Sequence, residues 1–158
     1  GQAISDSARA AGDLAIETAR SAGVKVSYDT NLRLRLWDLD TARAKIHATV
    51  PLCDYVLPSL DDSQQLTGLE KAEDIADFYL RLGAPVVALK MGAEGSLIAT
   101  PSERWRISPH KVQALDATGA GDTFDGSFVA RLLEGDDLPT AARYANVAAA
   151  LSRSEERR

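Results

Sequence analysis

Apolar and polar residues follow two different periods along this chain. Apolar residues recur at helical spacing over residues 5–22, and Gly23 suits the left-handed position that commonly follows a helix. Residues 24–29 then alternate as a strand does. Residues 85–90 are almost continuously apolar, which is typical of a strand buried on both faces of a parallel sheet.

Comparable patterns predict the remaining elements. We expect further helices over residues 41–49, 59–68, 70–82, 122–133 and 139–151. We expect further strands over residues 54–57, 96–100 and 112–115. Because helices and strands alternate, the pattern predicts an α/β fold with a mostly parallel sheet. Ligands of such sheets bind beyond the carboxyl ends of the strands, where the predicted loops are 29–37, 58–62, 90–96 and 116–122.

Composition narrows the class of protein. The 158 residues carry 18 Lys and Arg against 23 Asp and Glu, a net charge of −5, which disfavours a nucleic-acid-binding protein. Cys53 is the single cysteine, so an internal disulfide and a zinc site built from several cysteines are excluded. No apolar run approaches the roughly 20 residues of a membrane helix. We expect a cytoplasmic protein without a membrane partner.

Residues 116–124 read Asp-Ala-Thr-Gly-Ala-Gly-Asp-Thr-Phe and precede a predicted helix. With small side chains at Gly119, Ala120 and Gly121, backbone N–H groups can converge on an anion at the positive end of the helix dipole. A carboxylate beside an anion site is suited to removing the proton from a hydroxyl that attacks a phosphate, which makes Asp122 a candidate general base. The alternatives are that Asp122 only caps the helix, or that Asp125, nearly one turn later, is the base.

This segment closely resembles the C-terminal signature of the ribokinase-like (PfkB) sugar kinases. The resemblance implies that Gly119, Ala120 and Gly121 form an anion hole for the transferring phosphate, and that Gly119 and Gly121 contact ATP. It also implies that Asp122 is the catalytic base and contacts the sugar. We therefore expect a ribokinase-like, doubly wound α/β fold with helices on both faces of the sheet. Relatives of this kind are longer, so we expect residues 1–158 to be the C-terminal part of such a domain, without its lid and N-terminal half.

Two further segments look most like the 2-keto-3-deoxygluconate kinases of that family. They are Asp-Thr-Asn-Leu-Arg at 29–33 and Leu-Pro-Ser-Leu-Asp-Asp at 57–62. The resemblance implies that Arg33 meets both the substrate and a nucleotide phosphate, with Asn31 close by at the ATP site. A guanidinium can fork onto a carboxylate or phosphate, although a solvated loop charge would explain Arg33 as well.

Ser59 and Asp62 occupy the place where most members of the family carry an Asn-x-x-Glu motif linked to magnesium and phosphate. The resemblance implies that Ser59 contacts ATP and that Asp62 holds a Mg²⁺-bound water, in keeping with the preference of Mg²⁺ for oxygen ligands. The pattern Ser-x-x-Asp is also that of a simple helix cap, and both roles are compatible.

The turn at 90–96 and a late helix complete the expected ATP site. In the resembled kinases this turn lies beside the ATP ribose and phosphates, which implies contacts from Lys90, Gly92, Ala93, Gly95 and Ser96. Asn146 matches a residue that lines the adenine pocket. Without the resemblance, the turn at 90–96 is an ordinary hairpin turn, and Asn146 is an amide on the surface of a helix.

The expected activity is transfer of the γ-phosphoryl group of ATP, with Mg²⁺, to a hydroxyl of 2-keto-3-deoxygluconate. Two alternatives stay open: a catalytically inactive fragment, and another sugar kinase such as a fructokinase or ribokinase. We expect the 158-residue chain alone to be inactive, and to form homo-oligomers or to pair with the missing half.

Overall fold

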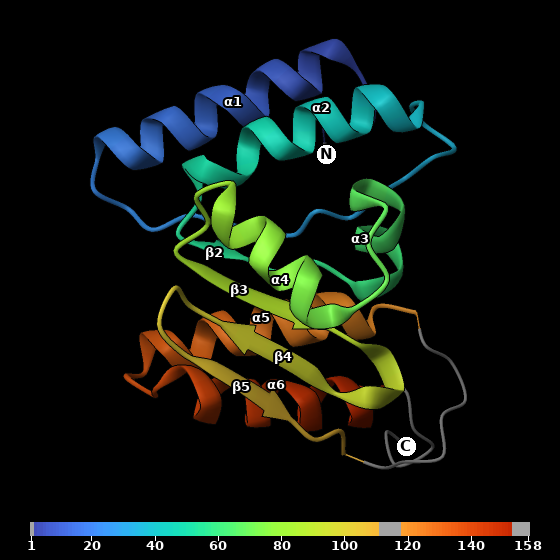
Figure 1. The fold of residues 1–158 in the computed structure, drawn as a ribbon. Coiled ribbons are helices and arrows are strands. Elements are labelled where there is room, and N and C mark those ends of the chain that lie inside the picture. The colour runs from blue at the N-terminus through green and yellow to red at the C-terminus, as the bar shows by residue number, and fades with distance from the viewer. Residues whose placement is uncertain (1, 111–117, 153–158) are drawn as a thin grey trace.

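In the part of the chain that the computed structural model describes, residues 2–110 and 118–152, five strands form one sheet in the order β1-β2-β3-β4-β5 (Figure 1). The strands are β1 (Ser27–Tyr28), β2 (Tyr55–Val56), β3 (Val86–Lys90), β4 (Ser96–Ala99) and β5 (Arg104–Ile107). The first three are parallel, and β4 and β5 continue the sheet antiparallel to their neighbours. The described sheet is therefore mixed and not mostly parallel as expected, with its parallel half at the N-terminal side.

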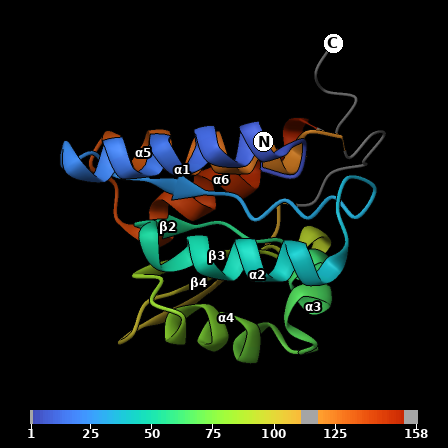
Figure 2. The same cartoon turned by 90° about the horizontal axis from the view of Figure 1, so that it is seen from above.

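Helices cover both faces of this sheet. They are α1 (Asp6–Ser21), α2 (Leu39–Thr49), α3 (Leu60–Thr67), α4 (Ala72–Arg81), α5 (Ala120–Leu133) and α6 (Leu138–Ser152). Short 3-10 helices follow α2 at Val50–Leu52 and β3 at Gly92–Glu94. Figure 2 shows α4 on one side of the strands and α5 with α6 on the other. The expected α/β fold with helices on both faces is confirmed.

The period of two along the strands decides which helix each side chain meets. Val87 and Leu89 of β3 pack in a cluster with α4, whereas Ala88 between them packs in a cluster with α5 and α6. All three are fully buried, in agreement with the predicted strand over 85–90. A third cluster joins α2 to α3 through Ala42, Ile46 and Leu66. The sheet is thus a rigid support for the loops at its carboxyl edge.

Some predicted boundaries were wrong. Only Ser27–Tyr28 of the predicted strand 24–29 pairs in the sheet. The helix expected from residue 41 begins at Leu39, because Asp38 is its N-cap residue and accepts a hydrogen bond from the Thr41 N–H at 2.8 Å. The helix expected from Asp122 begins two residues earlier, at Ala120. β5 was missed, although Arg104–Ile107 alternates exposed and less exposed residues. The strand expected over 112–115 lies outside the described residues.

None of the described helices is long and apolar enough to span a lipid bilayer.

Candidate active site

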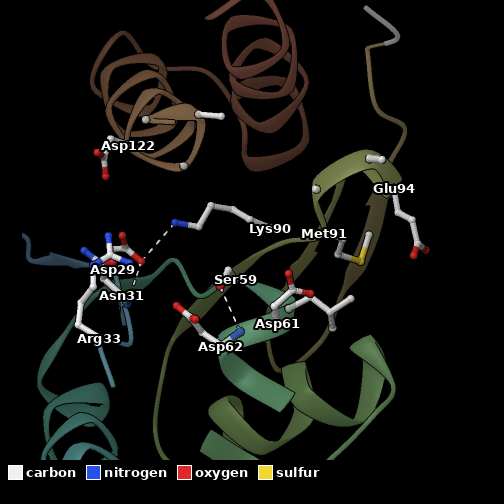
Figure 3. Close-up of a pocket in the computed structure, with 16 residues that line it drawn as sticks. Asp29, Asn31, Arg33, Ser59, Asp61, Asp62, Lys90, Met91, Glu94 and Asp122 are labelled. Carbon is white, nitrogen blue, oxygen red and sulfur yellow. Dashed lines mark hydrogen bonds and ion pairs between the residues drawn. The ribbon is translucent and has the colours of Figure 1, made fainter. Parts of the chain in front are cut away.

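Four loops meet at the carboxyl edge of the parallel strands and enclose a cleft of about 650 Å³ (Figure 3). Three of these loops follow β1, β2 and β3, and the fourth leads into α5. Among the residues predicted for the site, eleven line this cleft: Asn31, Arg33, Ser59, Asp62, Lys90, Gly92, Ala93, Gly119, Ala120, Gly121 and Asp122. Residues as far apart in the sequence as Asn31 and Asp122 thus line one cleft, because parallel strands end at the same edge.

The glycine motif forms the start of α5. Gly119 is the N-cap residue and adopts a left-handed backbone with φ +76°, a conformation that glycine takes without strain. The backbone N–H groups of Ala120, Gly121 and Asp122 stand in the first helical turn, where an α-helix offers no intrahelical acceptor. This geometry suits an anion, as the motif predicted. Asp116 and Ala117, which begin the motif, lie outside the described residues.

Asp122 is the third residue of α5 and its side chain is exposed at the cleft. Gly119, not Asp122, is the cap, so the structure does not support the reading of Asp122 as a simple N-cap. Within the described residues, its carboxylate makes no hydrogen bond or ion pair. It is therefore available to a hydroxyl group that enters the cleft.

Lys90 reaches the glycine motif from the end of β3. Its Nζ lies 2.8 Å and 3.0 Å from the two carboxylate oxygens of Asp125 and 3.2 Å from Oδ1 of Asp29. The three side chains are mostly buried, with 12% of Lys90, 17% of Asp125 and 27% of Asp29 exposed. Burial, together with the nearby Asp29 carboxylate, raises the pKa of Asp125 to about 7, and the Lys90 ammonium opposes this shift.

Asn31 and Arg33 extend from the loop after β1. Asn31 is the one described residue other than glycine with a positive φ, at 37°, and its backbone N–H donates to Oδ1 of Asp29 at 3.2 Å. The turn presents the exposed Arg33 side chain at the cleft. Its guanidinium makes no hydrogen bond or ion pair with the described residues, so it is free to bind an anionic group.

Ser59 and Asp62 occupy the first turn of α3. Ser59 is the N-cap residue, and its hydroxyl accepts from the Asp62 N–H at 3.4 Å. Oδ2 of Asp62 accepts from the Leu32 N–H at 3.0 Å, which ties α3 to the loop that carries Arg33. Burial raises the pKa of Asp62 above its ordinary value, and the Leu32 hydrogen bond opposes that shift. The predicted cap is confirmed, and the carboxylate has a second, positioning contact.

Carboxylates of the cleft can assist a Mg²⁺ ion but do not form a cage for one. Among the described residues, no three His, Cys, Asp or Glu side chains come together as a metal site. Mg²⁺ commonly binds through substrate phosphates, waters and only one or two carboxylates. Asp62 at the cleft is compatible with that mode, with one of its oxygens already used by Leu32.

Gly95 and Asn146 lie in a smaller hollow beside the cleft, which shares Lys90 and Gly121 with it. Gly95 has φ +90°, and a Cβ there would stand 2.1 Å from the Ile107 carbonyl oxygen, so only glycine fits. Asn146 is buried and donates to the carbonyl oxygens of Ile107 and Ser108 at 3.3 and 3.2 Å. The helix-surface alternative for Asn146 is therefore wrong.

Ser96 lines neither space. It is fully buried at the start of β4, and its hydroxyl has no hydrogen-bond partner among the described residues.

Sequence reasoning assigned no role to Asp29 and treated Asp125 only as a rival base. Both contact Lys90. Helical spacing is one feature of the sequence that pointed to Asp125, since it follows Asp122 by three residues and so lies on the same side of α5. The position of Lys90 at the end of a buried strand is the other feature, because it places the ammonium at the carboxyl edge of the sheet. Their pairing depends on how α5 meets β3, which the local sequence does not encode.

Comparisons with known proteins agree with this geometry. Residues 2–157 match the model of the "pfkB family carbohydrate kinase". The chain is 34% identical to the 2-dehydro-3-deoxygluconokinase of Bacillus subtilis (strain 168) over 84% of its own length and 41% of that protein. It is 36% identical to the enzyme of the same name from Thermoproteus tenax, over 94% and 45%.

A solved structure shares the fold. The fructokinase from Vibrio cholerae O395, in its "fructose, ADP and calcium ion bound form", superposes with a TM-score of 0.89 at 31% identity, over 97% of this chain and 52% of that one. The chain thus spans about half the length of the relatives it matches. Its fold is ribokinase-like, and it belongs to the pfkB family of carbohydrate kinases.

Proposed function

We propose that this chain carries the phosphoryl-transfer half of an ATP-dependent sugar kinase. The observation that carries the proposal is the meeting of the Gly119–Gly121 turn, the Lys90 ammonium and the exposed Asp122 carboxylate in one cleft. Positioning and electrostatics dominate phosphoryl transfer, and this cleft supplies N–H donors, a cation and a base for it.

Each residue has a distinct part in the proposed reaction. Asp122 accepts the proton of the attacking sugar hydroxyl, since its carboxylate is exposed to the cleft. The N–H groups at the start of α5 stabilise charge on the transferring phosphoryl group. Arg33, whose guanidinium has no partner among the described residues, binds the substrate and a nucleotide phosphate. Asn31, Ser59 and the turn at 90–96 border the ATP phosphates and ribose.

The hollow beside the cleft is the proposed place for the adenine end of ATP. It is lined by Gly95, Phe124, Asn146 and small alanine side chains and lies next to the glycine turn. Asn146 shapes this hollow indirectly, by holding the backbone after β5 through two hydrogen bonds. Ser96 supports the turn from inside the fold, since its side chain is buried.

Mg²⁺ is the proposed metal, and when bound to the nucleotide it would neutralise phosphate charge. Asp62 is the described residue we assign to it, through a bound water. The same carboxylate orients the Arg33 loop through the Leu32 N–H, so its role in the site does not depend on the metal alone.

We propose 2-keto-3-deoxygluconate as the sugar. A free guanidinium at the cleft suits the carboxylate of a sugar acid, and two relatives named 2-dehydro-3-deoxygluconokinase are 34% and 36% identical to the chain. Fructose is the second candidate, because the structurally similar Vibrio cholerae enzyme is described with fructose bound. Association with a second copy, or with polypeptide equivalent to the other half of the relatives, stays a prediction.

Purified protein that includes the equivalent of that other half, assayed for ADP release with 2-keto-3-deoxygluconate, fructose and ribose in parallel, tests the proposal. We expect the highest kcat/KM for the sugar acid. Higher kcat/KM for fructose or ribose would correct the substrate, and the absence of turnover with all three would contradict the kinase assignment.

A further inference from the structure

Lys90 is held between two carboxylates at the anion-binding end of α5. Its Nζ is 2.8 Å from Asp125 Oδ2 and 3.2 Å from Asp29 Oδ1, and a Cβ at Gly121 would stand 3.7 Å from the same atom. With both carboxylates ionised, this group of three side chains carries a net charge of −1. A phosphate bound at the glycine turn would then meet a negative neighbour in place of a cation.

A neutral carboxyl group at Asp125 or Asp29 would remove this excess negative charge when phosphate is bound. Asp125 is the more buried of the two, with 17% of its side chain exposed against 27% for Asp29. In the described residues the charged groups that act on Asp125 are Lys90 on β3 and Asp29 after β1, and α6 and β2 pack apolar residues against the other face of α5. Burial already raises the pKa of Asp125 to about 7, close to neutral pH.

We infer that Asp125 is the positioning residue for Lys90, and that it takes up a proton when a nucleotide phosphate binds beside Gly121. The neutral carboxyl group still accepts a hydrogen bond from the Lys90 ammonium through its carbonyl oxygen, which keeps Nζ at the glycine turn. Asp29 remains the carboxylate paired with Lys90, and the excess negative charge is removed. This inference rests on the proposed function, since it assumes a nucleotide in the cleft.

The two roles of Asp125 can be separated by two substitutions. Asp125→Asn keeps a hydrogen-bond acceptor and removes the charge, as protonation does. Asp125→Leu removes both. We expect ADP to bind Asp125→Asn at least as tightly as the unaltered chain at pH 8, and to bind Asp125→Leu about tenfold more weakly than Asp125→Asn, the usual scale for a lost hydrogen bond to a charged group.

Isothermal titration of the 158-residue chain with ADP, in two buffers of different ionisation enthalpy at pH 7, measures the protons taken up. We expect uptake of up to about half a proton by Asp125, because a group with a pKa near 7 is half protonated at that pH. Asp125→Asn should take up fewer protons by that amount. The ADP phosphates contribute equally in both proteins, so subtracting one uptake value from the other removes their contribution. Equal uptake in the two proteins would overturn the inference.

Two controls test whether Asp125 acts through Lys90. Adenosine has no phosphate, so it should bind the unaltered chain, Asp125→Asn and Asp125→Leu alike, which also shows that these three proteins are folded. In a Lys90→Met background, Asp125→Asn and Asp125→Leu should bind ADP with equal affinity. A remaining difference in ADP affinity would overturn the positioning role of Asp125. If Asp125→Leu fails to fold, proton uptake in the unaltered chain and Asp125→Asn decides the question.

The outcomes also separate this inference from the proposed function. An unaltered chain that binds neither ADP nor adenosine would contradict the proposed function and, with it, the role of Asp125. A chain that binds ADP without the expected proton uptake, or with equal affinity in the Asn and Leu variants, would contradict the role of Asp125 alone.

Discussion

Gly121 and Lys90 lie on different elements, yet a Cβ at Gly121 would stand 3.7 Å from Lys90 Nζ, in ordinary van der Waals contact. The start of α5 therefore meets the end of β3, and the glycine motif and the Lys90 side chain line the same cleft (Figure 3). A methyl group at position 121 would occupy that space without a clash with the protein.

This relationship predicts that Gly121→Ala weakens ADP binding without lowering the stability of the fold. Gly121 lies within α5 and its φ is not positive, so alanine should leave the free energy of unfolding equal or raise it by about 0.5–1 kcal/mol. The methyl group should obstruct an anion at the turn and weaken ADP binding. Calorimetric titration with urea unfolding on the same samples measures both, and unchanged ADP affinity would argue against the turn as the phosphate site.

Asp122→Asn should abolish turnover in a catalytically competent form of the protein and leave nucleotide affinity nearly unchanged. The amide keeps the shape of the side chain but cannot accept the proton, and loss of a general base typically costs roughly 10²–10⁴-fold in rate. Pre-steady-state kinetics with direct ATP-binding measurements provide the comparison. A variant with near-normal kcat would transfer the role of base to another residue, with Asp125 the first alternative.

Arg33→Lys should raise KM for the sugar acid more than KM for ATP. Lysine keeps the charge but loses the two-pronged hydrogen bonding that a carboxylate favours. The contrast between the two KM values is the measurement, with Arg35→Lys in the same exposed loop as a matched control. An unchanged KM for the sugar acid would indicate a neutral sugar or a structural role for Arg33.

Asp125→Asn should change how stability depends on pH. The folded protein holds the pKa of Asp125 at about 7, above its ordinary 3.8, so the folded state binds this proton more tightly than the unfolded state. The contribution of Asp125 to the free energy of unfolding is therefore fully present below about pH 4 and is lost as pH rises through 7.

Urea unfolding of both proteins from pH 4.5 to 8 tests this. The stability of the unaltered chain relative to Asp125→Asn should decline over that range. A difference that stays constant would contradict the raised pKa.

Residues whose place at the cleft depends on their own loop could be predicted from the sequence. Gly119 and Asp122 follow from a local pattern of small residues before a helix, and Ser59 from a local cap. The Lys90–Asp125 pair was not predictable in that way, because it depends on how two elements pack whose paired residues are 35 positions apart in the sequence. The burial of Asn146 was not predictable for the same reason: its partners are the backbone carbonyls of Ile107 and Ser108, at and after the end of β5, a strand that the pattern of residues did not reveal.

Wrong boundaries have similar causes. The strand at 24–29 is shortened to two paired residues, since pairing needs a partner strand as well as an alternating pattern, and β2 provides only Tyr55 and Val56. The fold class was predictable because the alternation of helices and strands is repeated along the whole chain, so single errors do not change it.

The central claim is that the cleft between the Gly119–Gly121 turn and the turn at 90–96 binds the phosphates of a nucleotide. A crystal structure of the chain with a non-hydrolysable ATP analogue tests it most directly. We predict the terminal phosphates within hydrogen-bonding distance of the N–H groups at the start of α5 and of Lys90 Nζ, with the adenine beside Asn146. Phosphates bound elsewhere on the chain would contradict the claim.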